Sequence, residues 1–240
     1  LLKKWLGLLR ADNAQREYYL TDIIAMAVKD RARVHPLIAP TVAEVLGVND
    51  KLQLAELEAS YRRARAEALM RAGVTLIDPL RIDIRGEVSV GRDVTIGVNV
   101  VLEGPVQLGN DIRIGPNCVL NAVTIGDGTT IKPNCVLERA TIGRQCEIGP
   151  FTRIRPETEL ADEVHLGNFV EVKKSRVGTG SKINHLSYVG DSTVGGKVNV
   201  GAGWRRSCRR GRRLGLKQPQ AGRREQNQRS HRRSIPRTSR

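Results

Sequence analysis

The chain repeats with a period of six from residue 90 to residue 203. Aliphatic side chains recur at twenty positions, with only four steps of five: Val90, Ile96, Leu102, Leu108, Ile114, Leu120, Ile125, Ile131, Leu137, Ile142, Ile148, Ile154, Leu160, Leu166, Val172, Val177, Ile183, Val189, Val194 and Val200. This hexad repeat is typical of a parallel β-helix, in which three hexads form one coil and the aliphatic side chains point inward. Burial of each would contribute about 1.5–3 kcal/mol. The repeat itself does not determine the hand of the helix, although the general crossover rule would favour a right-handed connection.

The basic charge of the chain is concentrated at its C-terminal end. The chain has 40 Lys and Arg against 25 Asp and Glu, but residues 204–240 carry a net charge of +13 and residues 1–203 only +2. A basic chain commonly binds nucleic acid or an anionic membrane surface. Here the excess belongs to the tail alone, so we expect nucleic acid to bind only non-specifically, through the tail.

Two shorter pieces precede the repeat. Residues 1–40 have helical spacing in "REYYLTDIIAMAV" and a short extended piece, "RVHPLI", and are too few to bury a core alone. Residues 41–73 predict a linker and one long amphipathic connector helix, capped by Asn49 and ended by Gly73. We therefore expect a small α/β piece over residues 1–40, then the connector, then a β-helix over residues 74–203.

Three cysteines lie within the repeat. Cys118, Cys135 and Cys146 each stand four residues after a repeat aliphatic, where small or β-branched residues are usual. A small thiol fits there, and we expect Cys118 and Cys135 to stack in adjacent coils about 4.8 Å apart. Zinc or a disulfide is the less favoured reading, because no ligand-type spacing appears.

The repeat aligns two basic side chains. Three steps after Ile154 comes Val172, so Arg155 and Lys173 should lie in one column, at a position that elsewhere prefers glycine. Like charges stacked in this way cost energy unless an anion lies between them. A phosphate would satisfy both, and two solvated side chains pointing apart are the plain alternative.

A second column contains a histidine. The register places Asn168, His185 and Ala202 in one line and Glu171 near Tyr188 in another. A histidine with a carboxylate and a phenol close by is a candidate general base with an orienting partner. A lone surface histidine usually has no function, but an anion site on the neighbouring face favours a catalytic role here.

At these residues the chain resembles a known family. The stretches "REYYLTDIIAMAV", "EVLGVNDKLQLAELE", "IGPFTRIRPETEL", "HLGNFVEVKKSRVGTGSKINHLSYVGD" and "VNVGAG" resemble the bacterial bifunctional N-acetylglucosamine-1-phosphate uridyltransferase/glucosamine-1-phosphate acetyltransferase. The resemblance implies a left-handed β-helix, a homotrimer, and acetyl transfer from acetyl-CoA to glucosamine-1-phosphate. The N-acetylglucosamine-1-phosphate formed would then be coupled to UTP, giving UDP-N-acetylglucosamine for peptidoglycan and lipopolysaccharide.

The resemblance also assigns roles to residues. It implies that Arg155 and Lys173 bind the sugar phosphate and that His185 is the general base. The repeat register alone already indicated a phosphate between the two basic residues and a candidate base at His185. It further implies the following: Glu171 supports the histidine, Tyr188 and Asn199 contact the sugar, and Ala202 makes a backbone contact near the cofactor. No protein-bound metal is implied for this domain, because magnesium belongs to the uridyltransferase domain.

The chain departs from the family at both ends. It opens on Leu1 without a methionine, and most of the uridyltransferase domain would lie upstream. The resemblance thus implies that residues 1–40 are a C-terminal α/β remnant of that domain and that residues 74–203 are an incomplete acetyltransferase β-helix. After Gly203 the family continues into further coils that line the coenzyme A site, whereas here residues 204–240 are basic and poor in apolar residues, which predicts disorder. A changed reading frame is the favoured explanation, and a true basic arm is the other. We expect impaired acetyl transfer from this chain.

Two other function classes stay open. One is a non-catalytic β-helix that binds polyanions through its tail. The other is a metal-dependent hydratase on the same repeat, which is disfavoured because only His165 and His185 of the four histidines lie in the repeat. No apolar run is long enough for a membrane span, and the start "LLKKWLGLLR" is too short and too charged for a signal peptide, so we expect a cytoplasmic protein without membrane partners.

Overall fold

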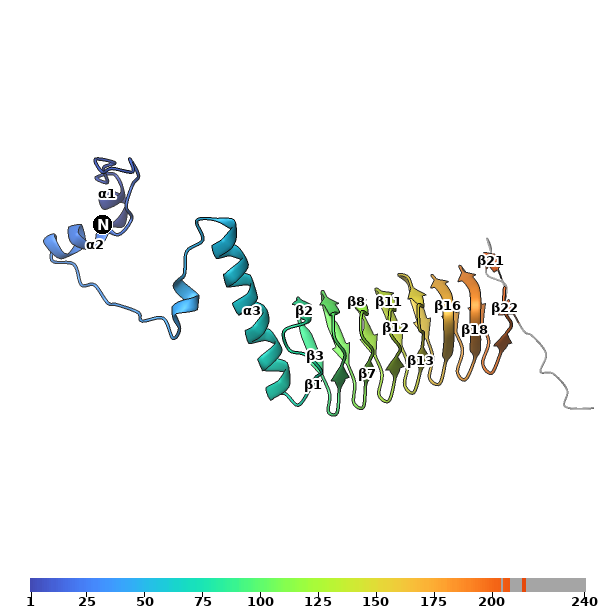
Figure 1. The fold of residues 1–240 in the computed structure, drawn as a ribbon. Coiled ribbons are helices and arrows are strands. Elements are labelled where there is room, and N and C mark those ends of the chain that lie inside the picture. The colour runs from blue at the N-terminus through green and yellow to red at the C-terminus, as the bar shows by residue number, and fades with distance from the viewer. Residues whose placement is uncertain (204, 208–212, 215–240) are drawn as a thin grey trace, which may run out of the picture. The chain divides into compact units, whose positions relative to one another are not determined.

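The computed structural model describes residues 1–203, 205–207 and 213–214 (Figure 1). The chain divides into two compact units, Leu1–Leu57 and a second that begins at Glu58. Each unit is described by itself.

The first unit is helical. It contains α1 (Leu2–Leu6), α2 (Asp22–Lys29), the short 3-10 helix η1 (Val42–Val45) and the start of α3 (Lys51–Arg71). Trp5, Ile23 and Ala27 form its small core, and the Trp5 indole donates to the Asp30 carboxylate at 2.9 Å. The β part of the expected α/β remnant is not formed in the described residues. The extended piece "RVHPLI" pairs with no strand, since no neighbouring segment offers its backbone groups a partner.

The connector helix α3 begins later than predicted and has a different cap. Asp50, not Asn49, caps it, because the Asp50 side chain accepts the backbone N–H of Gln53 at 2.8 Å. Asn49 instead donates its own N–H to the Gln53 side chain at 2.8 Å. The predicted end is confirmed, since Gly73 follows the helix with a φ of +97°.

The apolar face predicted for α3 is largely exposed. Leu52 and Tyr61 are 69% and 56% exposed, and in this helix only Ala66 and Leu69 are buried. Both pack into the core of the first coil, beside Val74. The prediction of an amphipathic helix was wrong in this respect, because in the part of α3 that belongs to the second unit only Ala66 and Leu69 are buried.

The second unit consists of short parallel strands stacked coil upon coil (Figure 1). The strands are β1 (Thr75–Leu76), β2 (Ile82–Arg85), β3 (Val88–Val90), β4 (Thr95–Ile96), β5 (Val100–Glu103), β6 (Val106–Leu108), β7 (Arg113–Ile114), β8 (Val119–Asn121), β9 (Thr124–Ile125), β10 (Thr130–Ile131), β11 (Val136–Glu138), β12 (Ala140–Ile142), β13 (Glu147–Ile148), β14 (Arg153–Ile154), β15 (Thr158–Leu160), β16 (His165–Lys173), β17 (Arg176–Val177), β18 (Lys182–Gly190), β19 (Thr193–Val194), β20 (Asn199–Val200), β21 (Arg205–Ser207) and β22 (Arg213–Leu214). Each short strand pairs with the strand three further along the chain, which lies on the same face of the next coil. The long strands β16 and β18 change this count, because each runs along two faces of the coil. The fold is the left-handed parallel β-helix that the hexads and the resemblance predicted.

The hexad aliphatics form the core, as predicted. All twenty except Val90 are buried, and Val90 packs against the others. The register is the one read from the sequence: Ile154 pairs with Val172, and Val172 with Val189. The six-residue period therefore fixes which residues of successive coils are neighbours.

The three cysteines of the repeat are buried and free, and Cys118 and Cys135 lie in adjacent coils, as expected. Their thiols bond to backbone carbonyls, for example Cys118 to Lys132 at 3.2 Å. The hydrogen bond with Cys135, together with burial, raises the pKa of Cys118, and burial raises that of Cys146. The three cysteines are therefore packing residues of the core, which water does not reach.

The corners of the coils use left-handed backbone conformations. One corner column consists of Asn99, Asn117 and Asn134, with φ of 57°, 58° and 61°. Asn99 donates its side-chain amide to Asn117 at 3.0 Å, and Asn117 donates to Asn134 at 3.3 Å. Asparagine suits this corner, because its short polar side chain tolerates positive φ and links one coil to the next.

Stacking continues past Gly203 in the described residues. Strand β21 pairs with β18, placing Arg206 beside Val189, and β22 pairs with β19, placing Leu214 beside Val194. The tail was predicted to be disordered from Trp204, and for these five residues that prediction was wrong. The rest of the tail lies outside the described residues. The last repeat residues, Val189, Val194 and Val200, are buried.

Candidate active site

The predicted site residues lie on the last coils of the β-helix. Glu171 pairs in register with Tyr188, and Lys173 with Gly190. Arg155 follows Ile154, whose partner is Val172, so Arg155 lies one coil from Lys173. The column predicted from the hexads is therefore present, with two basic side chains about 4.8 Å apart at their backbones.

Arg155 has a partner that the sequence did not indicate. Its Nη1 donates to Oε1 of Glu171 at 2.9 Å, and the two side chains are 35% and 37% exposed. Glu171 was predicted to support His185, but in this structure it pairs with Arg155. The like-charge stack is thus partly neutralised by a carboxylate of the protein itself.

Tyr188 explains the glycine at the top of the basic column. A Cβ added at Gly190 would collide with the phenol hydroxyl and ring of Tyr188, so the tyrosine folds over this glycine. The hydroxyl is thereby held near the column of Lys173. The repeat register places Tyr188 near the site but does not indicate that Gly190 is needed beneath its ring.

His185 lies at the corner between two faces. It pairs in register with Asn168 and is exposed. Its neighbour Asn184 donates to Asn199 at 3.1 Å, which places Asn199 on the coil beside it. Ala202 is exposed in the turn just before Gly203, whose N–H donates to the carbonyl of Leu186 at 3.1 Å. His185, Asn199 and Ala202 thus share one corner, next to the face with Arg155 and Lys173.

An exposed apolar column follows the same corner. Phe151, Phe169 and Leu186 are 50%, 53% and 60% exposed, and the two phenyl rings stack with centroids 5.3 Å apart. All three have positive φ, a conformation unfavourable for bulky side chains. No other large hydrophobic side chain between residues 81 and 203 is exposed. The hexad pattern did not predict this column, although the column continues the asparagines of the lower coils in register.

A second charged group lies on the neighbouring face. Lys132 forms an ion pair with Glu147, and Glu147 faces His165 Nδ1 at 3.2 Å. The hydrogen bond from Lys132 lowers the pKa of Glu147 below its usual range. Because each charge here has a partner, we interpret Lys132, Glu147 and His165 as a structural link between coils.

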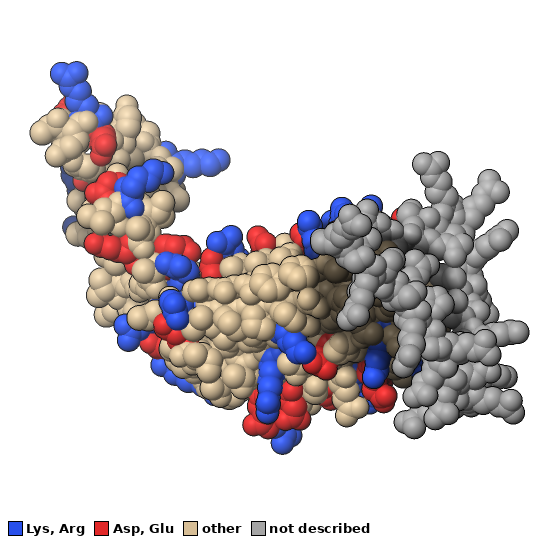
Figure 2. All heavy atoms as spheres, turned by 45° about the vertical axis from the view of Figure 1, so that its right-hand side comes forward, with Lys and Arg blue, Asp and Glu red and all other residues tan. Residues whose placement is uncertain are grey.

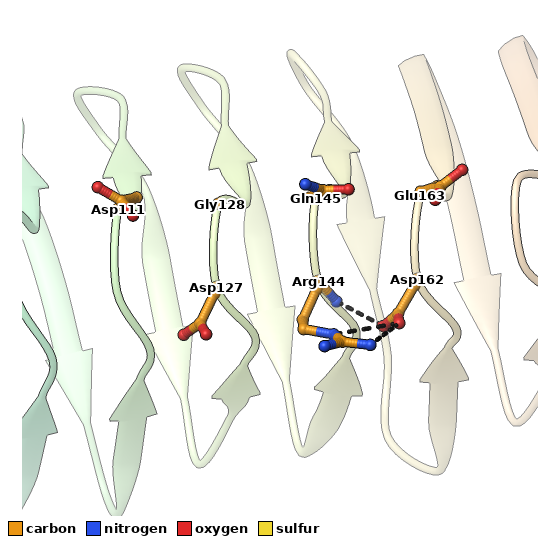
Figure 3. Close-up of a pocket in the computed structure, with 7 residues that line it drawn as sticks. All are labelled: Asp111, Asp127, Gly128, Arg144, Gln145, Asp162 and Glu163. Carbon is orange, nitrogen blue, oxygen red and sulfur yellow. Dashed lines mark hydrogen bonds and ion pairs between the residues drawn. The ribbon is translucent and has the colours of Figure 1, made fainter.

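The pocket in Figure 3 lies at a different corner. Its volume is about 420 Å³, and its lining residues are Asp111, Asp127, Gly128, Arg144, Gln145, Asp162 and Glu163. Arg144 pairs with Asp162 at 2.8 Å, and this hydrogen bond lowers the pKa of Asp162. None of the predicted site residues lines it. In the searched, described part of the chain, no three His, Cys, Asp or Glu side chains are placed to hold a metal ion.

The surface charge of the coils is mixed. On the face shown in Figure 2, acidic and basic side chains lie next to one another along the coils. This agrees with the net charge of only +2 over residues 1–203. No helix within the described ranges is long and apolar enough to cross a membrane.

Stacked hexads that carry basic, imidazole and phenol groups outward define a protein of the hexapeptide-repeat β-helix class. Two solved structures of this kind overlap weakly with the chain. The UDP-N-acetylglucosamine acyltransferase from Campylobacter jejuni is 18% identical, with a TM-score of 0.27, over 54% of this chain and 64% of that one. The acetyltransferase domain of PglB from Neisseria gonorrhoeae, in complex with acetyl coenzyme A, is 18% identical, with a TM-score of 0.23, over 62% and 60%.

Sequence comparison finds curated proteins similar to most of the chain. The family model of the GMPPB C-terminal domain matches residues 84–177. The chain is 57% identical over 202 residues to the bifunctional protein GlmU of Alkalilimnicola ehrlichii, and 57% over 203 residues to that of Methylococcus capsulatus. Each match covers 84% of this chain and 44% of the relative, so the chain spans less than half the length of these relatives. Over the matched part, the chain is therefore similar to the bifunctional GlmU proteins.

Proposed function

We propose that the β-helix transfers an acetyl group from acetyl-CoA to the amine of glucosamine-1-phosphate, giving N-acetylglucosamine-1-phosphate. The observation that carries this proposal is the placement of Arg155 and Lys173 one coil apart on the face beside the His185 corner. Two cations at this spacing suit a phosphate. Homology to the GlmU proteins supports the same assignment.

The chemistry needs one base and no covalent enzyme intermediate. His185 would accept a proton from the sugar amine as the nitrogen attacks the thioester carbonyl of acetyl-CoA. The C–N bond forms, the C–S bond breaks, and the proton passes to the departing thiolate of coenzyme A. Tyr188 and Asn199 would contact the sugar, and the backbone at Ala202 would lie near the acetyl donor. The buried cysteines have no part in this reaction.

Binding measurements test the phosphate clamp, defined here as Arg155 and Lys173. We expect Lys173→Ala to weaken binding of glucosamine-1-phosphate by about tenfold or more in calorimetry, since it removes a charge-assisted hydrogen bond. Binding of glucosamine, which lacks the phosphate, should be unchanged. Equal losses for both ligands would argue against a phosphate role.

Steady-state kinetics test the base. We expect His185→Ala to lower kcat about 100-fold, with little change in KM, because the histidine would act on the proton rather than on substrate affinity. An unchanged kcat would remove His185 from the mechanism. A thermal-shift assay tests the polyanion-binding alternative. A thermal midpoint raised by DNA or heparin, but not by glucosamine-1-phosphate, would favour that alternative.

We further propose that the chain forms a homotrimer and that the apolar column Phe151, Phe169 and Leu186 lies within the contact between copies. Exposed apolar side chains collected at one place commonly mark such contacts. Asparagine occupies the same corner in the lower coils, so Phe169→Asn should preserve the coil and reduce the mass measured by light scattering. An unchanged mass would place the contact elsewhere.

The remaining parts of the assignment concern the longer relatives. Uridyl transfer with magnesium, a role in UDP-N-acetylglucosamine synthesis for peptidoglycan and lipopolysaccharide, and a cytoplasmic location are proposed from the resemblance. Growth of a strain that depends on this gene, with and without supplied N-acetylglucosamine-1-phosphate, would test the pathway.

A further inference from the structure

Glu171 is the only described side chain that hydrogen-bonds to Arg155. The bond joins Arg155 Nη1 to Glu171 Oε1 at 2.9 Å, and both side chains are about one-third exposed. In the backbone register Glu171 lies beside Arg153, not beside Arg155. The Arg155 side chain therefore leans two residues back along its strand to reach the carboxylate.

This pair changes the charge of the clamp before any ligand binds. Arg155 and Lys173 alone would carry two positive charges one coil apart, a repulsive arrangement. With Glu171 included, the three side chains carry a net charge of +1. An incoming anion must therefore compete with a carboxylate that already uses one Arg155 donor.

We propose that Glu171 is the internal counter-ion of the clamp, which holds Arg155 in the free protein and is displaced when a sugar phosphate binds. This proposal rests on the proposed function, since it requires a phosphate at Arg155 and Lys173. A phosphate carries a charge of about −1.5 to −2 and three acceptor oxygens, so it can replace the carboxylate on Arg155 and still bind Lys173. A sugar without a phosphate does not compete with Glu171 for Arg155, so Glu171 lowers the affinity for phosphorylated ligands alone.

The test is a gain of affinity in Glu171→Gln, which keeps the size of the side chain and removes its charge. Calorimetry at low ionic strength, with glucosamine-1-phosphate and with inorganic phosphate, should show binding about two- to fivefold tighter than in the wild type. Structural damage would weaken binding, so it cannot imitate this result. Binding of glucosamine should not change.

Glu138→Gln is the matched control. Glu138 pairs with Arg153 at 3.3 Å on the same face, and its side chain is 35% exposed. It lies outside the clamp, so this variant should bind phosphate like the wild type. Circular dichroism of both variants would confirm that the coil is intact.

The outcomes separate the two proposals. If the wild type binds phosphate and Lys173→Ala loses it, but Glu171→Gln binds no tighter than Glu138→Gln, the counter-ion role is wrong and the clamp stands. If neither the wild type nor Glu171→Gln binds phosphate, the proposed function fails, and the counter-ion role fails with it.

Discussion

Replacing Leu166 by alanine tests whether the hexad aliphatics carry the stability of the coil. Leu166 is fully buried, and its partner one coil below is Ile148 and one coil above is Ile183, both fully buried as well. Leu166→Ala removes three carbons, which at about 0.8 kcal/mol per buried carbon costs about 2.4 kcal/mol. A cavity between two intact coils adds to this, so we expect a loss of about 3–4 kcal/mol in the free energy of unfolding.

Urea unfolding followed by circular dichroism measures this loss. Leu80→Ala is the matched control, because Leu80 is 74% exposed, and it should change the free energy of unfolding by less than about 0.5 kcal/mol. A loss for Leu166→Ala no larger than for Leu80→Ala would show that stacking of the aliphatics does not hold the coils together.

Three further changes have definite expected results. Gly190→Ala should push Tyr188 off its position and weaken binding of glucosamine-1-phosphate in calorimetry, with circular dichroism unchanged. Gly167→Ala should lower the thermal midpoint markedly, because the added Cβ would overlap a backbone carbonyl of the next coil. Glu147 has a lowered pKa in the folded chain, so its contribution to stability is present above its unfolded pKa and is lost as pH falls through the folded value. Acid unfolding of Glu147→Gln should therefore depend less on pH in that range.

The period of the repeat predicted most of the fold. Because each step of six or five residues fixes the register, it placed Lys173 one coil from Arg155 and Glu171 beside Tyr188. It also placed Cys118 and Cys135 in adjacent coils. These are backbone relations, and a regular repeat determines them.

The helical part was less predictable. The spacing of leucines in α3 predicted a buried face, but Leu52 and Leu54 are exposed and only Ala66 and Leu69 of this helix are buried. Periodicity reports which residues share a face, not whether another element covers that face. The cap moved from Asn49 to Asp50 for a similar reason, since both side chains can cap and only the local geometry selects one.

The register does not determine which side chains pair on the surface of the coils. Glu171 could reach along its own strand, across to Tyr188 or diagonally to Arg155, and only the third is formed. The diagonal is favoured because Arg155 would otherwise face Lys173 with its charge uncompensated. The repulsion that first suggested a ligand at this column is therefore relieved from within the chain, so a phosphate has to bind more strongly than Glu171 does. For this reason a gain of affinity in Glu171→Gln distinguishes a ligand site from an ordinary ion pair.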